Sequence, residues 1–344
     1  MLSCIVLFPL QAQNLQGASQ PNLDFNKELA FNHLETYSDL APLLPGSDNS
    51  QNFLEYAKKT LENSLWSVEI QSWEHTNHIT LNNLIARKSS QGGNSKGIIV
   101  LGAHYDARIW ADKDPDINKR KEPVPGINDG GSGVVVLLEL ARALTISEGY
   151  EIWIILFDAE DQGGVSGWKG GRSGWIIGST YFVAQLSESD KDRIKLALIL
   201  DIVGDYNLNL HKEGSSDVRQ TNKIWELARE LGYADNFLDQ TGSSILDDHR
   251  PFIDEGITAV DIIQQRSRDG YEFFRWHHTT NDTIENVDRE SLGKVGRTVE
   301  YYIETLELNS VSSNLILSVL IISGVIVLSI TLFFVFRKKV FKKL

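Results

Sequence analysis

The sequence predicts an α/β fold: a single domain with a mostly parallel mixed sheet sandwiched by helices. Short apolar runs of strand length alternate along the chain with segments of helical periodicity, which is typical of such a sheet. No internal repeat and no long low-complexity linker divides the chain. With 344 residues, of which 42% are hydrophobic, the chain has ample material for a buried core.

The predicted elements follow a regular order. A helical pattern from Phe53 to Leu61 precedes an alternating pattern from Trp66 to Ile70, which indicates a helix and then a strand. Further strands are predicted at Leu81 to Ala86, Ile98 to Ala103, Ile152 to Phe157, Leu196 to Ile202 and Ala259 to Ile263. Further helices are predicted at Gly133 to Leu144, near Tyr181, at Asn222 to Leu231 before Gly232, and from about Arg289 to Leu308.

The C-terminal end carries a predicted transmembrane helix. The run from Leu315 to Phe336 has no charged residue, is long enough to span a bilayer, and is followed at once by a basic tail, residues 337–344. A basic flank of this kind normally stays in the cytoplasm. We therefore expect a single-pass protein, anchored in the lipid bilayer, whose tail is cytoplasmic.

The N-terminal end resembles part of a secretory signal. Residues 1–13 contain an apolar run from Leu2 to Leu10 and a small-residue exit, but no basic region precedes them, which suggests a truncated signal. Together with the basic tail, this pattern places the catalytic domain, residues 20–310, outside the cytoplasm. The formal net charge of −13 argues against a nucleic-acid partner. The sequence predicts no particular oligomeric state.

Polar residues follow several of the predicted strands. His104 and Asp106 form an H-x-D unit after the strand that ends at Ala103, and the carboxylate could orient the imidazole. Asp129 lies in a glycine-rich segment that opens a helix, where it could also serve simply as an N-cap. Taken alone, each of these signals also has a purely structural explanation.

The carboxylates after the next strands are harder to explain without a cation. Asp158, Glu160 and Asp161 follow one buried strand and would repel one another unless a cation neutralised them. Asp201 lies between Leu200 and Ile202, where an unpaired charge is costly.

The loop after the last strand adds two imidazoles, His277 and His278. The only cysteine, Cys4, lies inside the expected signal, so any metal must be held by His, Asp and Glu. Such a ligand set suits zinc, and active sites of parallel sheets form at the carboxyl ends of the strands.

This ordered set of motifs resembles the co-catalytic dizinc exopeptidases, which include secreted bacterial leucyl aminopeptidases, glutamate carboxypeptidase II and glutaminyl cyclases. The resemblance implies a zinc exopeptidase-like fold with two zinc ions per chain. It implies that the metal ligands are His104, Asp129, which bridges the two ions, Asp161, Asp201 and His278. It also implies that the catalytic residues are Glu160, as general base, and Asp106, which orients His104. Asp161 replaces a more usual glutamate, and His277 departs from the family's single histidine.

The activity that this resemblance implies is hydrolysis of an N-terminal residue from peptide substrates by a metal-activated water, with Glu160 as the base. A glutaminyl cyclase with one functional zinc is the alternative, because Asp247, Asp248, His249 and Trp276 resemble that branch of the family. The segment from Gly163 to Gly178 is expected to form a lid, a substrate rim or a variable surface loop. A catalytically inactive receptor or scaffold of the same fold is a second alternative, although no ligand has been lost.

Overall fold

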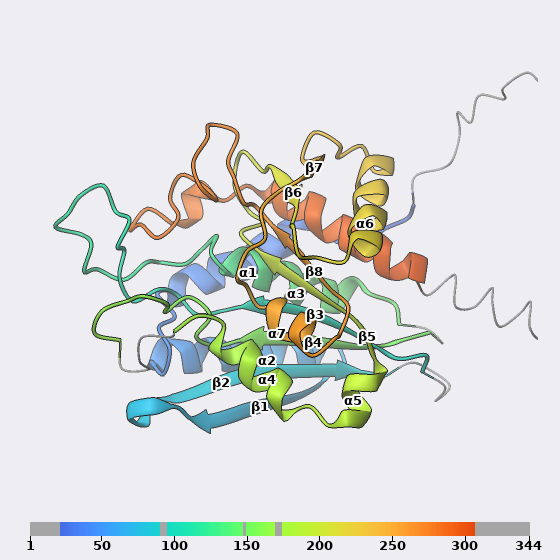
Figure 1. Cartoon of the computed structure of the whole chain (residues 1–344), viewed down its shortest axis with the longest axis horizontal. Coiled ribbons are helices and arrows are strands. Elements are labelled where there is room, and N and C mark those ends of the chain that lie inside the picture. The colour runs from blue at the N-terminus through green and yellow to red at the C-terminus, as the bar shows by residue number, and fades with distance from the viewer. Residues whose placement is uncertain (1–20, 90–94, 147–148, 169–173, 307–344) are drawn as a thin grey trace, which may run out of the picture.

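A six-stranded mixed sheet forms the centre of the domain in the computed structural model, which describes residues 21–89, 95–146, 149–168 and 174–306 (Figure 1). The strands lie in the order β1-β2-β4-β3-β5-β8. Their bounds are β1 Ser67–Glu74, β2 Thr80–Lys88, β3 Ile98–His104, β4 Glu151–Phe157, β5 Ile194–Asp201 and β8 Ala259–Ile263. Strands β4, β3, β5 and β8 are parallel, whereas β2 pairs antiparallel with both β4 and β1. The predicted mostly parallel mixed sheet is thus confirmed.

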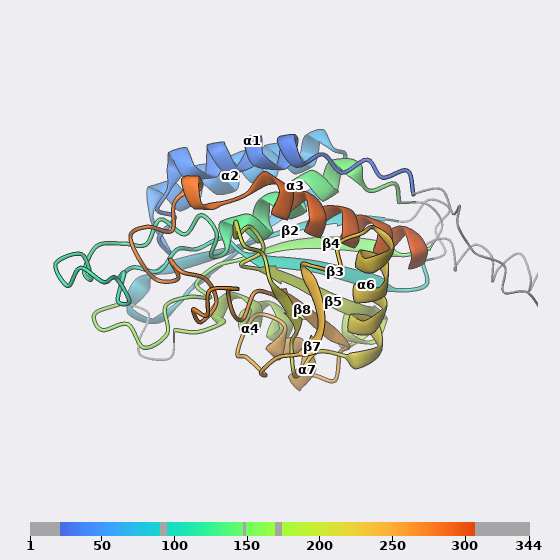
Figure 2. The ribbon, with the colours of Figure 1, turned by 90° about the horizontal axis from the view of Figure 1, so that it is seen from above.

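Helices cover both faces of this sheet, and Figure 2 shows the three layers edge-on. One face packs against α1 (Lys27–Leu40), α2 (Asp48–Asn63), α3 (Gly131–Ala143) and the helix at 289–306. The other face packs against α4 (Ile177–Gln185) and α7 (Arg250–Asp254), while α5 (Glu188–Arg193) precedes β5. Because β3 and β4 lie between two helical layers, nearly every residue of both strands is buried and apolar.

Several elements, α5 and α7 among them, were not predicted from the sequence. A second, two-stranded parallel sheet pairs β6 (Leu210–Lys212) with β7 (Phe237–Thr241), next to α6 (Val218–Glu230). Helix α1 was also not predicted, although it buries Ala30, Leu34 and Tyr37 at helical spacing and is capped by the Asn26 side chain. Two short 3-10 turns, at Thr76–His78 and Ile284–Asn286, complete the described elements.

None of the helices in the described ranges is long and apolar enough to cross a membrane. The predicted transmembrane segment 315–336, the basic tail 337–344 and the signal-like residues 1–13 lie outside the described residues. Within the domain, the carboxyl ends of β3, β4 and β5 lie at the same edge of the sheet, since the three strands are parallel. The polar residues that follow them are therefore brought together.

Candidate active site

The carboxyl edge of the sheet gathers the predicted site residues around Asp129. His104 and Asp201 are the last residues of β3 and β5. Glu160 and Asp161 follow β4, and Asp129 lies two residues before the start of α3. The glycines after Asp129 permit this close approach. A Cβ on Gly130 would lie 2.4 Å from Nε2 of His104, so a larger residue there would displace the imidazole.

One subsite consists of His104, Asp129 and Asp201, all buried. The His104 Nε2 atom lies 3.2 Å from Oδ1 of Asp129 and 3.2 Å from Oδ1 of Asp201. The His104 Nδ1 atom lies 3.1 Å from the backbone carbonyl oxygen of Asp106. Burial alone would lower the pKa of His104, but Asp201 and the other two carboxylates outweigh it and raise this pKa well above its ordinary value.

The second subsite lies on the other side of Asp129, between Asp161 and His278. The His278 Nε2 atom lies 3.1 Å from Oδ1 of Asp161 and 3.8 Å from Oδ2 of Asp129. The Asp129 Oδ2 atom is buried and has no hydrogen-bond partner. Burial lowers the pKa of His278 to about 3, so the imidazole is neutral, as a metal ligand must be.

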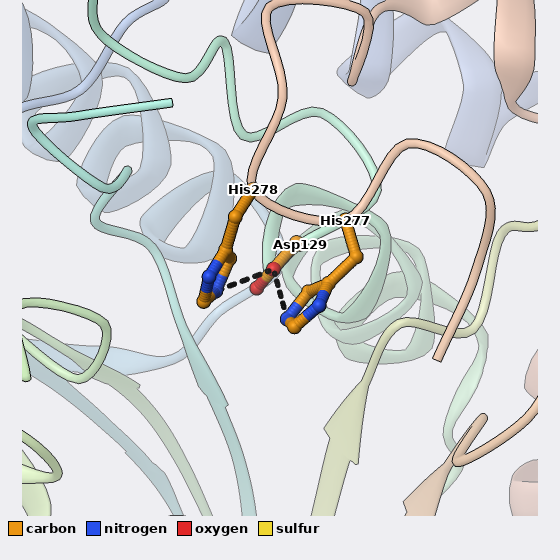
Figure 3. Close-up of side chains that lie close together, drawn as sticks. All are labelled: Asp129, His277 and His278. Carbon is orange, nitrogen blue, oxygen red and sulfur yellow. Dashed lines mark ion pairs between the residues drawn. The ribbon is translucent and has the colours of Figure 1, made fainter. Parts of the chain in front are cut away.

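His277 also faces this subsite. Figure 3 shows the side chains of His277 and His278 on either side of Asp129, and the His277 Nε2 atom lies 3.6 Å from Oδ2 of Asp129. The two imidazole rings have centroids 3.7 Å apart. Asp129, His277 and His278 therefore form a second buried group whose ligand atoms could hold a metal ion.

Asp106 stabilises the turn that carries Glu160 and Asp161. Its carboxylate accepts hydrogen bonds from the backbone N–H groups of Glu160 and Asp161, at 2.8 and 3.3 Å, and from the side chain of Gln162 at 3.0 Å. Its Oδ1 atom lies 3.4 Å from Nδ1 of His104. Asp106 thus positions both His104 and Glu160, which is a wider role than orienting the imidazole.

Glu160 lines a cavity of about 330 Å³. Burial, together with Asp247, Asp161 and Asp248, raises the pKa of its carboxyl well above the ordinary value, against an opposing effect of His104. A carboxyl group of this kind is suited to accept and return a proton. Asp201 beside it is also buried, and its pKa is raised to about 8.

The cavity is lined by both apolar and charged side chains. The apolar lining comes from Trp175, Ile202, Ile245, Leu246, Ile263 and Phe273. The Arg108 guanidinium donates to Oδ1 and to the backbone oxygen of Asp161, at 3.1 and 2.9 Å, and also pairs with Asp112. Trp175 belongs to the Gly163 to Gly178 segment, which therefore contributes a side chain to the cavity wall.

Several residues of the site were not predicted from the sequence. Arg108, Asp112 and Lys113 lie on the loop after β3 and carry no motif that marks them. Asp282 is buried and accepts hydrogen bonds from the backbone N–H groups of Asn128 and Asp129. Its place four residues after His278 was the available signal, because polar residues close to a metal ligand commonly orient other ligands.

A third group is formed by Asp247, His249 and Asp261, all buried. Burial and the neighbouring carboxylates raise the pKa of Asp261 well above its ordinary value. The His249 Nδ1 atom lies 3.4 Å from Oδ2 of Asp261, and among the described residues neither carboxylate oxygen of Asp261 nor Oδ2 of Asp247 has a hydrogen-bond partner.

The two groups around Asp129 fit a metal ion. They supply buried imidazole and carboxylate ligands, and the orphaned Oδ2 of Asp129 is a strong acceptor that only a cation or a donor could satisfy. Tetrahedral zinc with bonds of about 2.0 to 2.2 Å places neighbouring ligand atoms roughly 3.3 to 3.5 Å apart, close to the spacings seen here. Fold and site together define a metal-dependent enzyme with a zinc exopeptidase-like fold.

The model of peptidase family M28 matches residues 83–303, and the chain belongs to this family. Aminopeptidase YwaD of Bacillus subtilis (strain 168) is 31% identical over 226 residues, which cover 63% of this chain and 43% of that protein. The chain thus spans about half the length of the curated relatives it matches.

Solved structures match the domain almost throughout their own length. Glutaminyl cyclase from Tannerella forsythia is 31% identical, with a TM-score of 0.72 over 81% of this chain and 98% of that one. A Zn-dependent exopeptidase from Parabacteroides distasonis is 30% identical, with a TM-score of 0.70 over 80% and 97%. The predicted resemblance is therefore confirmed, and the relatives include both activities.

Proposed function

We propose that this protein is a glutaminyl-peptide cyclotransferase, which converts a free N-terminal glutamine into a pyroglutamyl residue and releases ammonia. One zinc ion, held by Asp129, Asp161 and His278, would serve the reaction. The observation that carries this proposal is the contrast between the two oxygens of Asp129, one paired with His104 and the other without a hydrogen-bond partner.

The first subsite needs no cation to satisfy its polar atoms. Both ring nitrogens of His104 have partners, Nδ1 at the carbonyl of Asp106 and Nε2 at the carboxylates of Asp129 and Asp201. In the second subsite, Oδ2 of Asp129 lies 3.8 Å from Nε2 of His278, which is too far for a hydrogen bond. A cation bound between these atoms would satisfy both, so the structure favours occupancy of the second subsite.

The bound zinc would act as a Lewis acid that polarises the side-chain amide of the substrate glutamine. Glu160 accepts a proton from the α-amine as its nitrogen forms a bond to the amide carbon. It then returns this proton to the amide nitrogen as the bond between that carbon and nitrogen breaks and ammonia leaves. The apolar side chains of the cavity would limit the access of water, which would otherwise compete with the amine.

The cavity fits the proposed substrate. A volume of about 330 Å³ accommodates one residue, and the exposed Leu246 and Trp175 stand at the rim where the rest of a peptide would leave. The carboxylates of Glu160 and Asp247 line the same cavity and could hold the α-amine close to the amide carbon. A blocked amine would lose this interaction and could not attack.

A dizinc aminopeptidase is the second candidate, and the spacing in the first subsite favours it. The 3.2 Å distances from His104 to Asp129 and Asp201 also match the spacing of zinc ligands. The ligands then required, His104, Asp129, Asp161, Asp201 and His278, are all at the site. In that reaction two zinc ions would activate a water and Glu160 would act as the general base. No observation favours an inactive scaffold.

A paired-substrate assay tests the proposal. The purified full chain is incubated with zinc and either a glutaminyl peptide or a leucyl peptide, and both ammonia and free amino acids are measured. The cyclotransferase releases ammonia from the glutaminyl peptide alone and liberates no amino acid. N-terminal acetylation is the matched control and should abolish ammonia release. Free leucine or glutamine without ammonia would establish the aminopeptidase instead.

We also propose that the enzyme is a single-pass membrane protein with its catalytic domain outside the cytoplasm, as the end segments of the sequence predict. The described domain is compatible with this placement. The backbone N–H groups of Asp24 and Phe25 donate to Glu300, at 2.6 and 2.9 Å, so the first described residues lie beside the last helix. Both ends of the domain leave it on the same side (Figure 1).

A further inference from the structure

We propose that His277 is a further catalytic residue, whose Nε2–H donates a hydrogen bond to the carbonyl oxygen of the amide under attack. The identity of that amide, a glutamine side chain, rests on the proposed function. The donor role itself would serve equally in the attack on a peptide bond. His277 is one of two adjacent histidines, and the metal site of the proposed function uses only His278.

The fold holds His277 rigidly at the cavity wall. The side chain is 8% exposed, and its ring packs against Phe273, with centroids 4.4 Å apart, and against His278. Asp129 and Glu160 line the same cavity, so the ring faces the space where the substrate amide would lie. Such a side chain needs no rearrangement to act in catalysis.

Lys113 determines which ring nitrogen of His277 carries the proton. The Nζ atom of Lys113 lies 2.9 Å from Nδ1 of His277. A lysine ammonium group has only donors, so Nδ1 must accept. An imidazole that accepts at Nδ1 carries its hydrogen at Nε2. Lys113 therefore fixes the tautomer in which the nitrogen nearest Asp129 is a donor.

This tautomer gives His277 and His278 different chemical properties. A metal ligand offers a lone pair, and Nε2 of His277 has none while its hydrogen is bound there. The His278 Nε2 atom lies 3.1 Å from Asp161 and remains available as a ligand. The two adjacent residues thus have different roles, with His278 as the ligand and His277 as the donor.

The Nε2–H of His277 lacks a partner among the described residues. The Oδ2 atom of Asp129 lies 3.6 Å away, beyond the usual length of an N–H···O hydrogen bond. That oxygen would bind the cation when the site is loaded. A substrate carbonyl oxygen next to the cation is the acceptor that remains, and negative charge grows on this oxygen as the amide is attacked.

The test compares three variants of the full chain with the wild type. His277→Phe keeps the ring shape and removes the donor, His277→Gln keeps an N–H donor, and Lys113→Met removes the group that fixes the tautomer. Zinc content, kcat and KM are measured on the glutaminyl peptide. Two-bond 1H–15N spectra of histidine-labelled wild type and Lys113→Met report the tautomer without any substrate.

We expect His277→Phe to bind as much zinc as the wild type, with kcat about 10² to 10³ lower and KM little changed, because the donor acts mainly in the transition state. The kcat of His277→Gln should be at least tenfold higher than that of His277→Phe. The spectra should show His277 protonated at Nε2 in the wild type and a mixture of tautomers in Lys113→Met, whose kcat falls less than that of His277→Phe.

Three results would overturn the inference: loss of zinc in His277→Phe, an unchanged kcat in that variant, or a wild-type His277 protonated at Nδ1 alone. Failure of the proposed function is distinguishable from these. A wild type that hydrolyses leucyl peptides and leaves glutaminyl peptides intact contradicts the cyclotransferase, while the same variants then test the donor on the leucyl substrate.

Discussion

The Oδ1 atom of Asp129 lies 3.2 Å from Nε2 of His104, whereas its Oδ2 atom has no hydrogen-bond partner and faces His277 and His278. One carboxylate thus separates a subsite that is closed by direct contacts from a subsite that is open to a cation. The proposal of a one-metal enzyme rests on this asymmetry.

Zinc content should depend on His278 and not on His104. We expect His278→Ala to lose the bound zinc, because it removes a ligand of the open subsite, and His104→Ala to retain it. Elemental analysis of both purified variants, with His277→Phe as the matched neighbour control, checks this. Two zinc ions in the wild type and one in His104→Ala would instead support the dizinc aminopeptidase.

Proton transfer should depend on Glu160. We expect Glu160→Gln to keep its fold and zinc while kcat falls by about 10² to 10⁴, because only the proton-accepting group is removed. Steady-state kinetics and circular dichroism of the variant provide the measurement. Undiminished turnover would rule out Glu160 as the base.

Stability should respond to pH through Asp158. Burial and the neighbouring Asp106 raise the pKa of this carboxyl from an ordinary value of 3.8 to about 8. The folded protein therefore keeps a proton that the unfolded chain has released, so the free energy of unfolding falls as pH rises through this window. Asp158→Asn has no proton to release at this position. As the pH rises, the Tm of the variant should therefore increase relative to that of the wild type.

The measurement is a series of thermal melts of wild type and Asp158→Asn from about pH 4 to about pH 8, the range between the two pKa values. Over this pH range, the difference in Tm between the two proteins should change by several degrees, which corresponds to more than about 1 kcal/mol in the free energy of unfolding. Parallel curves would show that Asp158 does not hold a proton in the folded state.

The orientation in the membrane should be determined by the basic tail after Arg337. In sealed inside-out vesicles, the catalytic domain should be protected from added protease and the tail after Arg337 should be cleaved, because the basic flank stays on the cytoplasmic side. Immunoblots against an epitope at each end would report the outcome. Cleavage of the domain with protection of the tail would reverse the assigned orientation.

The sequence predicted the sheet and the main site residues because both depend on local patterns. Buried parallel strands give continuous apolar runs, so β3, β4, β5 and β8 were placed within a few residues. The residues directly after these strands must meet at one edge, which brought His104, Glu160 and Asp201 together. The structure confirms that Asp129 joins them.

The rest of the site depends on contacts between distant segments, which no local pattern records. Lys113 meets His277 across 164 positions of the chain, and Arg108 meets Asp161 across 53. Each contact depends on how the loop after β3 folds over the sheet edge. The short strands β6 and β7 were missed for a related reason, since neither is long enough to show a period.

The mass of a glutaminyl peptide after incubation with the zinc-loaded full chain tests the central claim most directly. The account predicts a product lighter by one ammonia and no product shortened by a residue, with Glu160→Gln leaving the peptide unchanged over the same time. A peptide shortened by its N-terminal glutamine would contradict the account and establish the aminopeptidase.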